Sequence, residues 1–188
     1  MDTKLILSAL MLAALAAACG SSSSDGGLRA SEIPVAHTPP GGYQTFPPLV
    51  LAGCTEPLAP GAPALRGMWD TVEVNGTPPP VGHPLYGHFE RIEQCGNRIA
   101  ITSGGVIHDM VCDGTFENGV HDVAARDFTT PIDVVCTFEN GVHVLRPVLA
   151  PGVEVTRRLD GDVLVWNYLN GYVSRLVRLG PPESAPPR

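Results

Sequence analysis

Short runs of apolar or alternating residues, separated by two-residue turn motifs, fill most of the chain between residues 67 and 180. Alternation of apolar and polar positions is typical of a strand with one buried face. Asn-Gly and Asp-Gly pairs supply the positive φ angles of tight hairpin turns. The pattern predicts strands within residues 69–74, 85–94, 98–102, 106–116, from Val120, and within 132–139, 142–148, 153–159, 163–169 and 172–179.

Consecutive strands joined mostly by hairpins form an antiparallel meander. We therefore expect an all-β fold, a meander of eight to ten strands closed into a barrel, because closure removes exposed strand edges. A short repeat supports the hairpins, since residues 115–121 recur as residues 137–143. Each copy reads as a strand end, a turn and the start of the next strand.

An uncharged apolar stretch over residues 5–18 follows Lys4 and ends in small residues directly before Cys19. This pattern predicts an export signal, and it is shorter than the roughly 20 residues of a membrane-spanning helix. A cysteine at this position resembles the lipobox of bacterial lipoproteins. The resemblance implies that Cys19 becomes the lipidated first residue of the mature protein. A plain secretory signal cleaved near Ala18 is the alternative.

The expected organisation is a signal peptide over residues 1–18, a tether rich in Ser, Gly and Pro over 19–48, a β-barrel domain over 49–180 and a disordered tail over 181–188. The lipoprotein resemblance implies an exported protein of the bacterial cell envelope, whose partner is the membrane that holds Cys19. Gly20, rather than Asp, follows Cys19, which by the same resemblance favours the periplasmic face of the outer membrane.

Charge and composition narrow the class of partner. The net charge is −7, and Lys4 is the only lysine, so no basic patch for nucleic acid is expected. Glycine (21) and proline (19) are abundant, which suits many short strands and turns rather than a helical bundle.

Three segments of the predicted barrel are similar to lipocalins and related small lipid-binding barrels. The sequence Gly67-Met68-Trp69 looks like their Gly-x-Trp signature, residues 92–101 resemble their second hairpin, and residues 174–179 resemble their arginine-bearing last strand. The Thr-Asp-Tyr motif of typical lipocalins is absent. The resemblance implies that Trp69 closes one end of the barrel and that the barrel holds a small hydrophobic or amphipathic ligand.

Four cysteines remain in the barrel domain, and in an oxidising compartment they predict two disulfides. If Gly104-Gly105 is a hairpin turn, Cys112 faces position 96, next to Cys95. Cys112 and Cys136 are expected on strands separated by another strand, too far apart for a bond. We therefore expect Cys95–Cys112, and Cys54–Cys136 for the remaining pair.

A metal site is the competing interpretation of the same region. His121 and His143 follow the two repeated turns, at the same end as Cys95, Cys112 and Cys136. No closely spaced cysteine pair is present, so we expect no metal and no cofactor. The pairs His108-Asp109 and His121-Asp122 are not expected to be catalytic, because neighbours on a strand point to opposite faces.

Alternation along the strands gives the candidate interior of the barrel. An inward Arg175 could hold an acidic head group; packing over Trp69 or reaching solvent is the alternative. We expect a binding protein rather than an enzyme; a filled barrel acting as a structural or interaction protein, and a barrel hydratase or isomerase, are the alternatives. The candidate ligand-binding residues are Trp69, His88, His108, Met110, Phe138, Trp166, Tyr168 and Arg175.

Overall fold

The computed structural model describes residues 27–169 and 171–187. Cys19, the expected signal peptide and the first part of the expected tether lie outside these residues. In the part of the chain that is described, no helix is long and apolar enough to cross a membrane.

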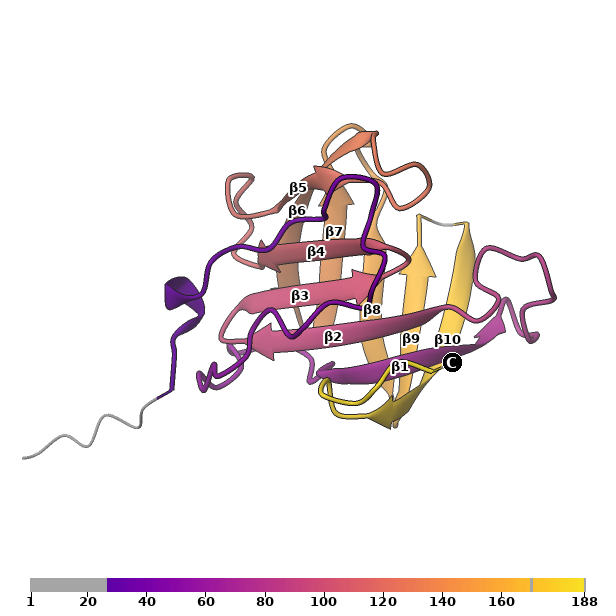
Figure 1. The fold of residues 1–188 in the computed structure, drawn as a ribbon, viewed down its shortest axis with the longest axis horizontal. Coiled ribbons are helices and arrows are strands. Elements are labelled where there is room, and N and C mark those ends of the chain that lie inside the picture. The colour runs from indigo at the N-terminus through magenta and orange to yellow at the C-terminus, as the bar shows by residue number, and fades with distance from the viewer. Residues whose placement is uncertain (1–26, 170, 188) are drawn as a thin grey trace, which may run out of the picture.

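The chain folds into one antiparallel sheet of ten strands, preceded by a single turn of 3₁₀ helix, η1 (Ala30–Glu32) (Figure 1). Strands follow one another as neighbours in the order β4-β3-β2-β1-β10-β9-β8-β7-β6-β5. The all-β meander predicted from the sequence is confirmed. The strands are β1 (Gly67–Val74), β2 (Phe89–Cys95), β3 (Arg98–Ser103), β4 (Val106–Val111), β5 (Val120–Val123), β6 (Pro131–Glu139), β7 (Val142–Pro147), β8 (Val155–Asp160), β9 (Val163–Tyr168) and β10 (Tyr172–Gly180).

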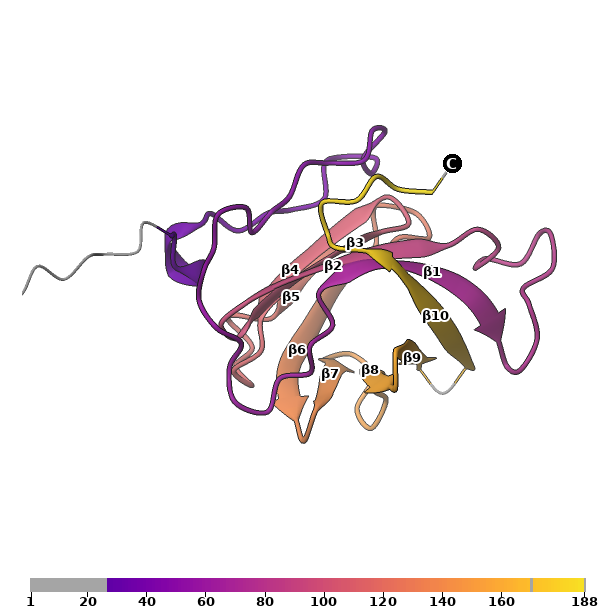
Figure 2. The same cartoon turned by 90° about the horizontal axis from the view of Figure 1, so that it is seen from below.

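The sheet curls until its two ends meet, which makes a nearly closed barrel (Figure 2). The ends, β4 and β5, share no continuous ladder. Instead, the Val111 amide donates to the Asn118 carbonyl at 2.8 Å, and Asp113 forms an isolated bridge with Thr137 on β6. β5 has only four residues, so the far half of β6 meets the residues after β4 directly. This irregular seam is where the barrel closes.

Apolar side chains from every part of the meander fill the closed end of the barrel. Trp69 is fully buried there and donates its indole N–H to the Leu65 carbonyl at 2.8 Å. The Arg178 guanidinium lies over the Trp69 ring at 4.2 Å. Gly67 passes so close that an added Cβ would lie 2.6 Å from the Arg178 Nη1 atom. This packing explains the residue types of the Gly-x-Trp segment and of the arginine-bearing last strand.

Residues 27–58 form a strap across the outer face of β2, β3 and β4 (Figure 1). Charged side chains on these strands satisfy its backbone: Asp109 accepts the Ala36 N–H at 2.9 Å, and Glu93 accepts the Leu51 N–H at 2.8 Å. Arg98 donates to three strap carbonyls and pairs with Asp109 at 2.6 Å. Residues 27–48, expected as free tether, are therefore packed on the barrel.

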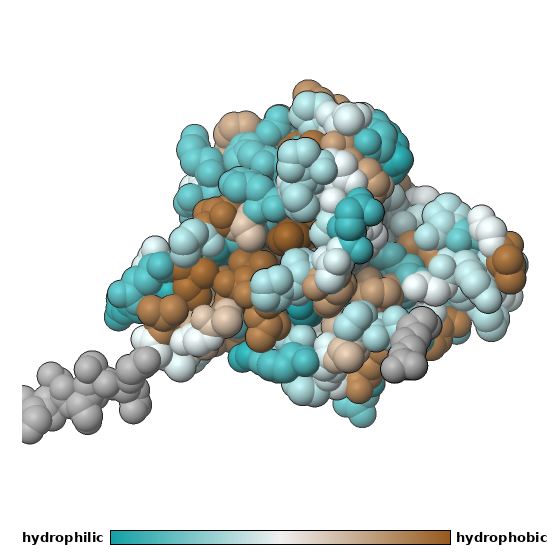
Figure 3. Space-filling model, in the orientation of Figure 1, coloured by the Kyte–Doolittle hydropathy of each residue, from teal (hydrophilic) through white to brown (hydrophobic). Residues whose placement is uncertain are grey.

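A second, smaller apolar cluster lies beneath this strap. The surface of the same face of the molecule carries apolar (brown) patches among hydrophilic (teal) ones (Figure 3). Pattern reasoning missed this segment because its contacts are made by isolated side chains and single backbone groups, without periodicity. The cluster consists of Ala30, Leu51, Cys95 and Ala100, with Ile33, Val50 and Cys54 against it.

The disulfides are Cys54–Cys95 and Cys112–Cys136, so both predicted pairings are wrong. Ser103 pairs with Val106 and Arg98 with Val111, one residue away from the expected register, so Asn97 lies opposite Cys112. Side chains alternate across a sheet, and Cys95 consequently points outward to the strap while Cys112 points into the barrel.

Cys112 can reach Cys136 because β5 is short. The two Cα atoms are 4.4 Å apart, at the point of the seam where no strand lies between them. The Cys112–Cys136 bond therefore closes the barrel covalently, and the Cys54–Cys95 bond fastens the strap to the end of β2.

Candidate ligand site inside the barrel

A cavity of about 540 Å³ lies inside the barrel. It opens at the end where the loops after β1, β5 and β7 and the turns after β3 and β9 gather, opposite the end closed by Trp69. A barrel of about this strand number is wide enough either to be filled by side chains or to hold one small ligand. The cavity shows that this barrel is not filled at its open end.

Five of the eight predicted ligand-binding residues line the cavity. Strand alternation along β4 and β9 directs four of them inward, and the fifth precedes β2. These residues are His88, His108, Met110, Trp166 and Tyr168.

The other three lie elsewhere. Trp69 is at the closed end, and Phe138 packs against the core with its ring 5.9 Å from that of His143. Arg175 is on the outer face, where it pairs with Asp160 at 3.2 Å. On β10 the inward positions are Ser174 and Leu176, whereas Val173 and Val177 are exposed and Arg175 is partly exposed on the same outer face. Because β10 carries apolar residues on both faces, its sequence does not indicate which face points into the barrel.

The strongest polar feature of the cavity wall is an ion pair between Glu90 and Arg157. Nε and Nη2 of Arg157 donate to the two Glu90 oxygens at 3.0 and 2.8 Å. Glu90 is fully buried, and Arg157 is 5% exposed. The Arg157 guanidinium also lies 4.8 Å from the centre of the Trp166 ring. Two charges in a largely apolar interior are thereby matched with each other.

Sequence reasoning missed this pair although a signal was present. Arg157 alternates with Val155 and Leu159, and Glu90 alternates with Ile92, so each charge shares a face with apolar residues. Such a charge is either exposed or paired. The sequence gives no sign that β2 and β8 face each other across the barrel.

His88 extends the pair toward the opening. Its ring stacks on Trp166 with centroids 5.3 Å apart, and its Nε2 is 3.5 Å from a Glu90 oxygen. That separation suits an ion pair when His88 is protonated, but it is longer than an ordinary N–H···O hydrogen bond. His88 is thus a polar side chain held by stacking, with hydrogen-bonding capacity left over.

An aromatic set lines the same side of the cavity. The Tyr168 and Tyr172 rings stack with centroids 5.1 Å apart, and the Trp166 ring meets each of them edge-on. Tyr172 was not among the predicted residues. Aromatic faces of this kind suit an apolar or aromatic ligand body.

Burial and charge set the protonation of the cavity groups. Burial would raise the pKa of Glu90, but the Arg157 guanidinium with its two hydrogen bonds, and the nearby His88, hold that pKa far below its usual value. Burial lowers the pKa of His108, whose Nε2 lies 3.2 Å from the Val123 carbonyl. Burial also raises the pKa of Tyr172. Near neutral pH Glu90 is therefore ionised, whereas His108 and Tyr172 are neutral.

Three buried nitrogen atoms of residues that line the cavity have no hydrogen-bond partner within the described residues. They are Nη1 of Arg157, Nε1 of Trp166 and Nε2 of His88. A buried polar group without a hydrogen bond costs roughly 1–3 kcal/mol, so such groups are uncommon in folded proteins. The Arg157 and Trp166 nitrogens are donors that each expose less than 1 Å², so a ligand atom with a lone pair could satisfy them after a small shift of these side chains.

Outside the cavity, two groups of side chains among the described residues lie close enough together to hold a metal ion. One is Cys112 with Cys136 and His143, and the other is Cys54 with Glu56 and Cys95. Of the histidine and cysteine set considered from the sequence, only Cys112, Cys136 and His143 come together. His121 instead lies at the surface, with Nδ1 2.6 Å from Asp133 and Nε2 2.7 Å from the Phe116 carbonyl.

Comparison of the chain with protein-family models and with curated proteins finds no match.

Proposed function

We propose that this protein binds a small amphipathic molecule inside its barrel. The observation that carries the proposal is the cavity of about 540 Å³, walled by aromatic and aliphatic side chains and containing the Glu90–Arg157 pair. Binding sites for small molecules are typically concave and mostly apolar, with a few polar groups that fix orientation. The apolar part of the ligand lies against Trp166, Tyr168 and Tyr172.

The polar part of the ligand is a hydrogen-bond acceptor. Glu90 is already occupied by Arg157, whereas Nη1 of Arg157 and Nε1 of Trp166 still have hydrogens to donate. A carboxylate or carbonyl oxygen is the complementary group. In this proposal the protein is a carrier rather than an enzyme, because Arg157 holds Glu90 ionised and removes it as a proton donor.

The proposed setting is the bacterial cell envelope, with Cys19 lipidated. The export-type segment before Cys19 supports this setting, and two disulfides are compatible with an oxidising compartment. Metabolic labelling with a fatty acid, followed by membrane fractionation, tests it. Cys19→Ser should lose the label and the membrane association; a variant that kept both would refute the anchor.

Binding can be tested with Trp166 as the reporter. The chain has two tryptophans, so Trp69→Phe leaves only the cavity tryptophan. Titration with dansyl-labelled undecanoic acid should give saturable energy transfer from Trp166 to the dansyl group. Native mass spectrometry of the freshly purified protein should then show whether a copurified molecule is displaced.

A matched pair of double variants locates the site. Glu90→Gln with Arg157→Met removes the inner pair without leaving a lone charge, and Asp160→Asn with Arg175→Met removes the outer pair. Losing hydrogen bonds to a charged head group should weaken probe binding about tenfold or more in the first variant only. Equal binding by both variants, or no saturable binding by the parent protein, would refute the proposal.

A further inference from the structure

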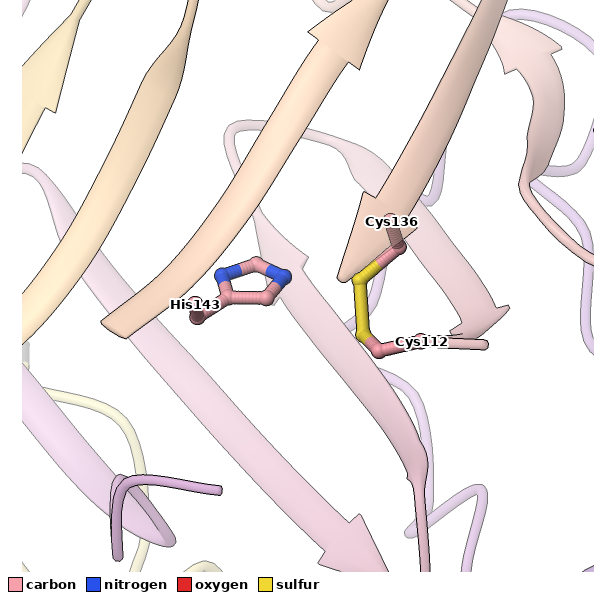
Figure 4. A group of neighbouring side chains, drawn as sticks. All are labelled: Cys112, Cys136 and His143. Carbon is pink, nitrogen blue, oxygen red and sulfur yellow. A yellow bond between two sulfur atoms is a disulfide. The ribbon is translucent and has the colours of Figure 1, made fainter. Parts of the chain in front are cut away.

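His143 is the least satisfied side chain in the barrel core. It is fully buried on β7, and neither Nδ1 nor Nε2 has a hydrogen-bond partner within the described residues. Its ring points from β7 toward the Cys112–Cys136 disulfide (Figure 4). Two unpaired ring nitrogens in one buried side chain are unusual enough to require an explanation.

The surroundings keep the His143 ring neutral. Burial and the neighbouring Arg157 guanidinium lower the pKa of His143 to about 3. Neutral imidazole is the form that donates a lone pair to a metal. Phe138 and Arg157 are the residues paired with His143 on the adjacent strands, and Arg157 is already engaged by Glu90. The ring nitrogen nearest the sulfur atoms is therefore free for a ligand.

The two sulfur atoms and one ring nitrogen all lie within 4.8 Å of one another. In a tetrahedral zinc site, bonds of about 2.0–2.3 Å place neighbouring ligand atoms about 3.5–3.8 Å apart. Once the S–S bond is broken, rotation of the cysteine side chains is enough to reach that spacing. We propose that Cys112, Cys136 and His143 form a metal site for a zinc-like divalent cation when their disulfide is reduced.

A dithiol serves as the reductant of the Cys112–Cys136 disulfide. The dithiol is oxidised to its own disulfide, and its two protons and two electrons pass to Cys112 and Cys136, which become thiols. The cation then displaces both thiol protons and binds two thiolates and the neutral His143. Two thiolate charges neutralise a divalent cation, so the site adds no net charge to the interior. Disulfide formation and metal binding exclude each other.

The other cysteine pair provides an internal comparison. Cys54 and Cys95 lie near Glu56, but the Glu56 Oε2 atom already accepts the Ala30 N–H at 3.0 Å. No buried nitrogen without a partner points at that pair among the described residues. Reduction there should release the strap without creating a comparable site, so the Cys54–Cys95 pair is the matched control.

Cobalt(II) titration after reduction tests the proposal. The protein is reduced with dithiothreitol, desalted without oxygen and titrated with Co²⁺, whose thiolate charge-transfer and tetrahedral d–d bands report the ligands. The reduced protein should bind one equivalent and the oxidised protein none. His143→Leu should weaken binding by about 100-fold or more, since even outer-shell partners are worth about 10–100-fold.

Two double variants keep the test decisive where His143→Leu alone does not fold. Cys54→Ala with Cys95→Ala should retain the cobalt spectrum, and Cys112→Ala with Cys136→Ala should lose it. The opposite pattern would refute the site. So would unchanged cobalt affinity in folded His143→Leu, absence of binding, or loss of the near-ultraviolet circular dichroism of the reduced protein, because unfolded thiols would then be the ligands.

Discussion

Arg157 on β8 and Glu90 on β2 face each other inside the barrel and are joined by two hydrogen bonds of 2.8 and 3.0 Å. They come from strands far apart in the sheet order, so this contact spans the interior rather than a ladder. It places the polar part of an otherwise apolar cavity at a fixed point.

Breaking one side of this pair should be far more harmful than removing both. Arg157→Met leaves the Glu90 carboxylate buried without its partner and should lower the free energy of unfolding by about 3–5 kcal/mol. The double variant Glu90→Leu with Arg157→Met should be close to neutral or more stable than the single variant. Urea unfolding followed by Trp166 fluorescence measures both; additive losses would contradict the pairing.

Acid should destabilise the protein through His143 before it affects Glu90. The folded-state pKa of His143 is about 3 against 6.5 for a free histidine, so below pH 6.5 the unfolded state binds the extra proton. Stability should therefore fall as the pH drops from 6.5, by up to about 1.4 kcal/mol per pH unit.

Between pH 6.5 and 4.5 His108, whose pKa is lowered by burial, acts in the same direction as His143, whereas Glu93, whose pKa is raised by burial, acts in the opposite direction. Glu90 has a depressed folded-state pKa, so its stabilisation is present above 4.5 and is lost only as the pH falls below that value. His143→Leu should flatten the stability profile between pH 6.5 and 4.5. His121→Gln is the control, because hydrogen bonding to Asp133 raises the pKa of His121 and gives a contribution of the opposite sign. An unchanged slope in His143→Leu would refute the assignment.

Local rules predicted the meander well, because hairpin turns are specified by adjacent residues. Asn75 and Asn140 have positive φ angles at the turns where the sequence places Asn-Gly. The predictions that were wrong, namely the disulfide pairings and the inward position of Arg175, depended on the exact register of a strand or on contacts between distant residues. A slip of one residue placed Cys95 on the outer face of the sheet, opposite to that of Cys112, and the orientation of β10 placed Arg175 outside.

The strap and the ion pair could not be predicted for a different reason. Arg98 binds carbonyls of Ala30, Ile33 and Pro34, far away along the chain, and Arg157 meets Glu90 across the barrel. No periodic pattern encodes such contacts. The five cavity residues found from the sequence were those fixed by alternation along a strand or by nearness to one.

Gly67→Ala should destabilise the closed end of the barrel. Its Cβ would lie 3.1 Å from the Gly180 carbonyl oxygen and 3.2 Å from Trp69 Nε1, and the indole is held in place by its hydrogen bond to the Leu65 carbonyl. Overpacking of this kind costs about 1–3 kcal/mol. Gly171→Ala is the matched control, since the nearest atom to its Cβ is 3.4 Å away. Thermal unfolding of the two variants compares them, and equal melting temperatures would argue against this packing.

Removing the Cys54–Cys95 disulfide should loosen the strap and leave the barrel intact. The Cys54→Ser with Cys95→Ser variant should be less stable by about 2–4 kcal/mol, the usual contribution of such a bond. Hydrogen exchange should accelerate most at the strap amides of Ala36, Thr38 and Leu51, whose acceptors are carboxylates on β4, β5 and β2.

The Cys112→Ser with Cys136→Ser variant should instead accelerate exchange along the seam, at Val111 and Gly114. Non-reducing peptide mapping should first find Cys54 bonded to Cys95. If the seam opened in the first variant, the two disulfides would not act on separate parts of the fold.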